Sequence, residues 1–187
     1  WGAKFGFALG KNREVNYNTI NNKEVFLKDT NNFIRSFLKT NFELTYRRAV
    51  KTRHRFGIAY TEEKVEDTIV KLNPSYFPSG VNKIRYPELY YTMSFYNVDY
   101  IPYPLKGFET IIGFSKKGFN QMVNVWEFNV LTGNYWQIFP KTYLAVNTAA
   151  NLKLPFKQPF INTRLLGYNE LAMQGYEYYV IDGVAGG

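Results

Sequence analysis

Few residues in this sequence have the type and spacing that catalysis requires. Ser36 and Lys39 match the Ser-x-x-Lys spacing of some acylating enzymes. That motif needs a helix, whereas an alternating strand pattern here places the two side chains on opposite faces. Glu62 and Glu63 are neighbours at a polar strand end, where solvation explains them better than the raised pKa of a general acid. We therefore expect no catalytic residue and no enzymatic activity.

Metal-binding side chains are equally scarce. The chain has no cysteine and one histidine, His54, so we expect neither a disulfide framework nor a zinc site. His54 falls in an alternating strand pattern, where we interpret it as a packing residue. The sequence has no nucleotide-binding motif, and we expect no cofactor.

The stretch with the clearest functional character is residues 173–183. It contains Gly175-Tyr176, continues with aromatic and β-branched residues, and ends in Asp182-Gly183. Turn-forming and polar residues at 158–160 and 166–169 precede it, so the segment is held between two bends. We interpret it as a functional loop and not as a core strand; an ordinary surface loop is the alternative.

The composition favours strands that lie at a boundary between apolar and aqueous surroundings. Aromatic residues make up 19% of the 187 residues, and Tyr and Phe prefer half-buried strands and the boundary between apolar and wet surroundings. This fits a membrane β-barrel with interfacial aromatic girdles. The net charge of +8 is dispersed and forms no compact basic and aromatic motif, so we expect no nucleic-acid partner. Both ends of the sequence are abrupt, and we expect a piece of a longer protein.

Apolar and polar residues alternate repeatedly, which predicts long antiparallel strands. The clearest example sets the apolar face of one strand against its polar face: Leu38, Phe42, Leu44 and Tyr46 against Lys39, Glu43 and Arg47. Similar patterns predict strands near residues 2–9, 54–61, 88–96, 108–114, 126–130 and 143–154. Residues 132–134 are, alternatively, a hairpin tip that splits the strand near 126–130, the sixth in chain order.

The connections between the predicted strands alternate in length. Those at 50–53, 101–104 and 137–140 are short, whereas those at 20–32, 73–83, 119–123 and from 157 onward are mostly longer. A transmembrane barrel alternates in this way, with short turns on one side of the membrane and long loops on the other. Soluble sandwiches seldom have strands this long with so many tyrosines.

Several segments together resemble the barrel of the Omp85 superfamily, in particular its Bacteroidetes-type members: residues 99–108, 158–160, 166–168 and 174–183. In that family the sixth extracellular loop folds back into the barrel and carries an Arg-Gly-Tyr/Phe tip. Gly175 and Tyr176 match this tip, but Gln174 stands at the position of the arginine. A neutral amide makes weaker contacts with the barrel wall than a guanidinium does.

The resemblance implies an all-β fold: an antiparallel transmembrane β-barrel, of which this chain holds about seven strands out of sixteen. Residues 1–156 resemble strands five to eleven, and residues 157–187 resemble the sixth extracellular loop. The remaining strands and the periplasmic domains lie elsewhere. We expect the loop motif to comprise Gln174, Gly175, Tyr176, Glu177, Asp182 and Gly183. Its acidic residues are expected to face basic side chains of the lumen, namely Lys39, Arg47 and Arg55.

The function implied by the resemblance is insertion of β-barrel proteins into the bacterial outer membrane, or movement of a polypeptide across it. The expected partners are outer-membrane lipid and lipopolysaccharide, unfolded outer-membrane protein clients, and accessory subunits of an assembly complex. Two other readings stay open. One is a passive porin-like or ligand-binding barrel, whose basic lumen would favour anions. The other is a soluble, aromatic-rich β-sandwich that binds a partner.

Overall fold

The computed structural model describes residues 1–120, 122–166 and 181–186. Seven long strands carry the fold: β1 (Gly2–Asn12), β4 (Arg35–Arg47), β5 (Thr52–Val65), β6 (Lys83–Val98), β7 (Gly107–Lys117), β8 (Val125–Phe139) and β9 (Thr142–Leu154). Together with the short β12 (Ala185–Gly186) they form one antiparallel sheet in the order β1-β4-β5-β6-β7-β8-β9-β12. Each predicted strand region lies in one of these strands, so the all-β antiparallel prediction is confirmed. Within the described residues the sheet is open, with β1 and β12 at its edges.

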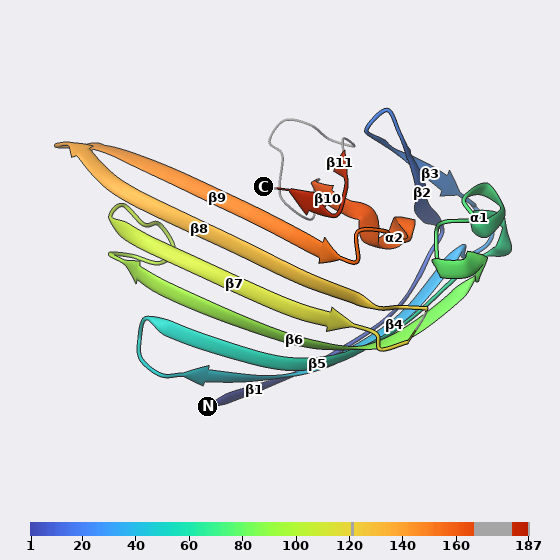
Figure 1. Cartoon of the computed structure of the whole chain (residues 1–187), viewed down its shortest axis with the longest axis horizontal. Helices are drawn as coiled ribbons and strands as arrows, with labels where there is room; N and C mark the ends of the chain where they lie inside the picture. The colour runs from blue at the N-terminus through green and yellow to red at the C-terminus, as the bar shows by residue number, and fades with distance from the viewer. Residues whose placement is uncertain (121, 167–180, 187) are drawn as a thin grey trace.

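The sheet is strongly curved, and its two faces differ in chemistry (Figure 1). Paired residues of neighbouring strands share a face, so the register defines rows across the sheet. One such row joins Phe42, Ile58 and Leu89, and the next joins Leu44, Phe56, Tyr91, Phe114 and Phe128. These rows belong to the convex face, where Phe42, Phe56 and Ile58 are 41%, 47% and 56% exposed. The opposite, concave face carries most of the charged and amide side chains of the central strands.

The connections at the two ends of the sheet follow the predicted difference in length with one exception, because the turn at 99–106 has eight residues and the connection at 118–124 has seven. The turns at 48–51, 99–106 and 140–141 lie at one end, whereas the connections at 13–34, 66–82 and 118–124 lie at the other, where the chain also leaves β9 at residue 155. Small elements fill this second, long-loop end: β2 (Glu14–Ile20), β3 (Lys23–Lys28), α1 (Asp67–Leu72), η1 (Pro78–Gly80), α2 (Phe160–Thr163), β10 (Arg164–Leu166) and β11 (Ile181–Asp182). The β2–β3 hairpin turns at Asn21 and Asn22, whose φ angles of 51° and 59° suit a type I′ turn.

The compact apolar core lies at the long-loop end and not between two layers of the sheet. Its buried members come from β2, the loops, α1 and the adjoining ends of β5 and β6: Val15, Ile34, Val65, Ile69, Tyr76, Phe77, Ile84 and Val123. Phe77 and Ile69 are almost fully buried. The loops therefore form a packed cap over that end, which local alternation does not predict.

Two predicted details are wrong. Residues 137–140 do not form the turn before β9, because β8 continues to Phe139 and the chain reverses at Pro140-Lys141, where Lys141 has a φ of 96°. Residues 132–134 are not a hairpin tip, since Gly133 pairs with Asn147 inside the β8–β9 ladder. In both places neighbouring strand-favouring aromatic residues, such as Tyr135 and Trp136, outweigh the local turn signal.

The turn at 99–106 is stabilised by one carboxylate. Asp99 Oδ1 accepts hydrogen bonds from the backbone N–H groups of Leu105 at 2.9 Å, of Lys106 at 3.1 Å and of Tyr100 at 3.0 Å. These bonds, led by the one from Leu105, hold the pKa of Asp99 below its ordinary value because they favour the ionised form. At the long-loop end the backbone N–H groups of Asn32 and Asn31 lower the pKa of Asp29 in the same way.

Candidate functional site: the concave face and the segment that covers it

The segment after β9 lies over the concave face of the sheet in its described parts α2, β10 and β11 (Figure 1). Its α2 helix is tied to the 73–77 loop, since the N–H of Phe160 donates to Ser75 O at 2.8 Å and that of Ile161 donates to Tyr76 O at 3.3 Å. The rings of Tyr76 and Phe160 also pack, 5.9 Å apart. The segment is thus attached to the loop cap.

Lys153, near the end of β9, makes a second attachment. Its ammonium donates to Asn162 O at 3.1 Å, and its backbone N–H donates to Val184 O at 2.6 Å. The Lys153 side chain is 8% exposed. The same residue therefore holds both the start and the end of the covering segment, while the pairing of Arg164 with Asp182 brings the stems β10 and β11 together.

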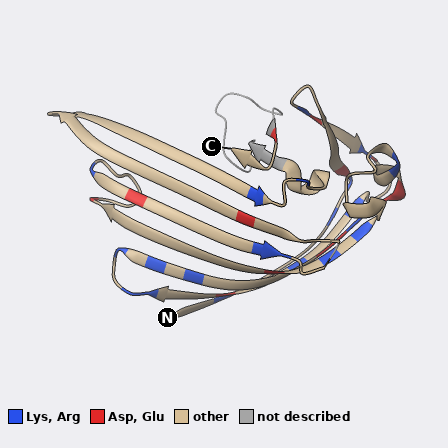
Figure 2. Cartoon of the chain, in the orientation of Figure 1, with Lys and Arg blue, Asp and Glu red and all other residues tan. Residues whose placement is uncertain are grey.

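A partly buried ion cluster on the concave face links β7, β8 and β9. Lys117 Nζ lies 2.6 Å from Glu127 Oε2, Asn151 Nδ2 donates to Glu127 Oε1 at 3.0 Å, and Lys153 Nζ lies 4.0 Å from the same oxygen. The side chains of Lys117 and Glu127 are 26% and 16% exposed. β8 and β9 carry a single charge each, Glu127 and Lys153 (Figure 2), so this cluster dominates the electrostatics of the hairpin.

Glycines shape the rest of the concave face. A Cβ placed on Gly57 would meet the ring of Tyr90, and one on Gly113 would meet the amide of Asn129. The ring of Tyr90 thus lies flat across β5, and its hydroxyl donates to Glu43 Oε2 at 3.4 Å. Small residues on this face let large side chains of the next strand cover the backbone, which permits the strong curvature.

A further ion pair anchors the concave face at the long-loop end. Arg35 Nε lies 2.6 Å from Glu63 Oε1, and the Glu63 side chain is 4% exposed. Both residues adjoin Ile34 and Val65 of the loop cap. Removal of one partner of a buried pair leaves an uncompensated charge, so this pair fixes where the cap joins the sheet.

The residues predicted from the sequence are not gathered into one cluster. Lys39, Arg47 and Arg55 all lie on the concave face, but Lys39 and Arg47 are eight positions apart along β4, roughly 26 Å at the usual strand rise. Asp182 is exposed in β11, and Gly183 donates its N–H to Thr163 O at 2.6 Å. Within the described part of the chain, none of the three basic side chains forms an ion pair with Asp182. Gln174, Gly175, Tyr176 and Glu177 lie outside the described residues.

The sequence analysis missed the cluster around Glu127. The available signal was a pair of opposite charges, Glu127 and Lys153, on the polar faces of consecutive strands. Which two residues face each other depends on register, and a shift of one residue would move Glu127 to the other face. Alternation gives the face of a side chain but not its partner.

The described residues offer little for other chemistry. Among them, no group of three His, Asp or Glu side chains could hold a metal ion. His54 lies on the convex face, with its Nδ1 2.8 Å from the Tyr91 hydroxyl and its ring stacked on those of Tyr46 and Tyr91, which agrees with a packing role. In the residues that the structure describes, no helix is long and apolar enough to cross a membrane.

The concave face is thus a polar surface with a tethered segment over it, and the convex face is an exposed apolar surface. Comparison of the chain with protein-family models, with curated proteins and with solved structures found no match.

Proposed function

We propose that this chain is one wall of a membrane-spanning antiparallel β-barrel, with the convex face toward lipid and the concave face toward a polar lumen. The observation that carries this proposal is the exposed apolar convex face. Soluble monomers rarely expose contiguous apolar patches larger than a few hundred Å², and here apolar rows run across neighbouring strands. The strands have 11 residues in β1 and β7 and up to 16 in β6, which meets the roughly 9 to 11 residues that a tilted strand needs to span a bilayer.

The barrel's proposed activity is insertion of outer-membrane proteins, or translocation of a polypeptide, in the bacterial outer membrane. Two features support this over an open channel. The resemblance to the Omp85 superfamily implies that the segment around Gly175 and Tyr176 lies inside the barrel, and Lys153 bonds to the chain on both sides of that segment, at Asn162 and Val184. An unpaired strand edge at a barrel seam can then template an incoming strand by β-augmentation. The seam strands of such a barrel lie outside this chain.

A passive channel is the second candidate. The observation that favours it is the distribution of Lys39, Arg47 and Arg55 along the concave face, because a lumen lined by separated cations attracts anions. A channel needs an open lumen, whereas an insertase needs a flexible wall. The two functions therefore differ in what happens to other membrane proteins when this one is removed.

Depletion of the full-length protein in its native host tests the proposal. Folded outer-membrane barrels are quantified by their heat-modifiable gel mobility, and the conductance of the purified protein is recorded in planar bilayers. An insertase predicts a broad fall in folded barrels. Unchanged levels of folded barrels would refute the insertase, and steady anion-selective conductance in that case would establish the channel.

A further inference from the structure

On the convex face, several strands change from apolar to basic as they reach the long-loop end. β1 runs through Phe7 and Leu9 to Lys11, and β5 runs through Ile58 and Tyr60, past Glu62, to Lys64. β6, which runs in the opposite direction, begins at Lys83, also on this face. These exposed lysine side chains thus lie at the border of the apolar surface, at the level where the phosphate groups of a bilayer would contact the protein.

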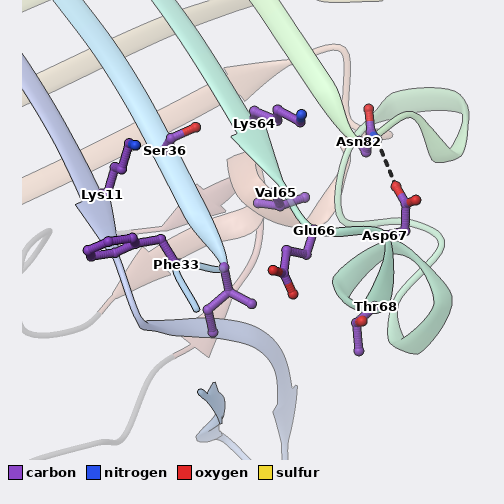
Figure 3. Close-up of a pocket in the computed structure, with 10 residues that line it drawn as sticks. Lys11, Phe33, Ser36, Lys64, Val65, Glu66, Asp67, Thr68 and Asn82 are labelled. Carbon is purple, nitrogen blue, oxygen red and sulfur yellow. Dashed lines mark hydrogen bonds between the residues drawn. The ribbon is translucent and has the colours of Figure 1, made fainter. Parts of the chain in front are cut away.

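A hollow of about 540 Å³ opens at this border, between the strand ends and the start of α1 (Figure 3). Lys11, Ser36 and Lys64 project from three neighbouring strands on one side of it, and the register pairs Ser36 with each of the two lysines. Glu66 and Asp67 line the opposite, loop side. The hollow therefore has a cationic rim that faces the apolar surface and an anionic rim that faces the loops.

The charges of the hollow are only partly satisfied. Asp67 Oδ1 accepts a hydrogen bond from Asn82 Nδ2 at 2.7 Å, and next to the hollow Lys83 forms an ion pair with Glu62 at 2.5 Å. In the described part of the chain, Lys11, Lys64 and Glu66 have no ion-pair partner. Lys11 Nζ lies 5.7 Å from the centroid of the Phe33 ring, which leaves the ammonium free to bind an anion.

We propose that this hollow binds the headgroup of a membrane lipid that carries both a phosphate and a primary ammonium group; phosphatidylethanolamine serves as the probe for this class of headgroup. Lys11, Ser36 and Lys64 hold the phosphate by charge-assisted bonds, Glu66 receives the ammonium, and the acyl chains lie along the apolar convex rows below. The cationic rim lies next to the apolar surface, where the phosphate of such a lipid would sit, and the anionic rim lies farther out, where its ammonium would sit. A purely anionic headgroup would be repelled by Glu66. This inference rests on the proposed contact of the convex face with lipid.

The test uses the purified full-length protein in detergent with an equimolar mixture of phosphatidylethanolamine, phosphatidylglycerol and phosphatidylcholine of identical acyl chains. Native mass spectrometry measures which lipids remain bound. The wild-type protein is expected to retain phosphatidylethanolamine about fivefold over each of the others. Lys64→Gln should lower retention of phosphatidylethanolamine and phosphatidylglycerol about fivefold, while Glu66→Gln should lower phosphatidylethanolamine alone and raise phosphatidylglycerol. Lys71→Gln, an exposed lysine of α1 outside the hollow, is the matched control and should change nothing.

Equal retention of the three lipids, or retention that Lys64→Gln leaves unchanged, would overturn the headgroup site. Displacement of the lipid by millimolar glycerophosphoethanolamine, which lacks acyl chains, would overturn the assignment to a lipid and point to a soluble ligand. Flotation of the same protein with phosphatidylcholine vesicles separates the two proposals. If the protein floats with the vesicles but shows no lipid preference in the mass spectra, only the headgroup site is refuted. If the protein does not float, the proposed membrane-spanning function is refuted.

Discussion

The convex and concave faces of this sheet are built from alternate residues of the same strands, yet different interactions govern them. On the convex face, apolar rows such as Phe42-Ile58-Leu89 are exposed and carry few polar bonds. On the concave face, glycines under large side chains and the cluster around Glu127 form a connected polar surface. In this sheet the apolar face is exposed and the polar face is partly covered. A soluble sandwich has the opposite arrangement, because a second layer of protein covers its apolar face.

A charge in the middle of the convex face should have the largest effect. Ile58→Lys is expected to destabilise the folded protein in a bilayer by about 2 to 4 kcal/mol, the range for a cation facing lipid at the midplane. Ala59→Lys is the matched control, because Ala59 is the next residue on β5 and faces the concave side, opposite Asn41 and Glu88. The measurement is the free energy of unfolding in urea, in lipid vesicles. If the lysine at position 58 is as well tolerated as the one at 59, the convex face does not contact lipid.

Removal of the central carboxylate should be the next largest effect, on the opposite face. Glu127→Ala removes the carboxylate that forms ion pairs with Lys117 and Lys153, and we expect the free energy of unfolding to fall by roughly 2 kcal/mol, below the range for a fully buried pair because these side chains keep some solvent contact. Glu127→Gln preserves the acceptor for Asn151 and should lose less. The same urea titration measures both variants.

Limited proteolysis gives a second readout of Glu127→Ala. Lys153 also holds Asn162, so a loosened lysine should expose residues 155–166 to protease before the strands unfold. Unchanged protection of this segment would mean that the tether does not depend on the ion cluster.

Packing of Tyr90 over Gly57 should matter less. Gly57→Ala forces the tyrosine ring aside, at a cost of about 1 kcal/mol, because the far end of the ring can move. In the double variant with Tyr90→Leu, most of that cost should disappear, which a double-mutant cycle measures as a coupling energy. Strictly additive effects would show that the flat ring does not shape this face.

The sequence predicts the strands and their faces well, because alternation with period two is a local property of each strand. Leu38 and Lys39 could be assigned to opposite faces without knowledge of any partner. The loop cap could not be predicted, since Phe77 and Ile69 are buried by contacts between segments far apart in the chain. The cluster around Glu127 was missed for the same reason, because its members meet only once the registers of β7, β8 and β9 are set.

The smallest expected effect lies at the turn 99–106, where the two faces end and a single carboxylate holds the chain. The pKa of Asp99 is lower in the folded turn than in an unfolded one. The carboxylate therefore stabilises the turn fully above the unfolded pKa, and this contribution is lost as the pH falls from there through the folded pKa. Backbone amide exchange at Leu105 and Lys106, corrected for its intrinsic pH dependence, should rise over that acidic window. Asp99→Asn keeps an oxygen acceptor but no titratable group, so exchange in this variant should stay flat with pH. A rise of equal size in both proteins would place the titration elsewhere, and the turn would then depend on the strands that it joins and not on its own carboxylate.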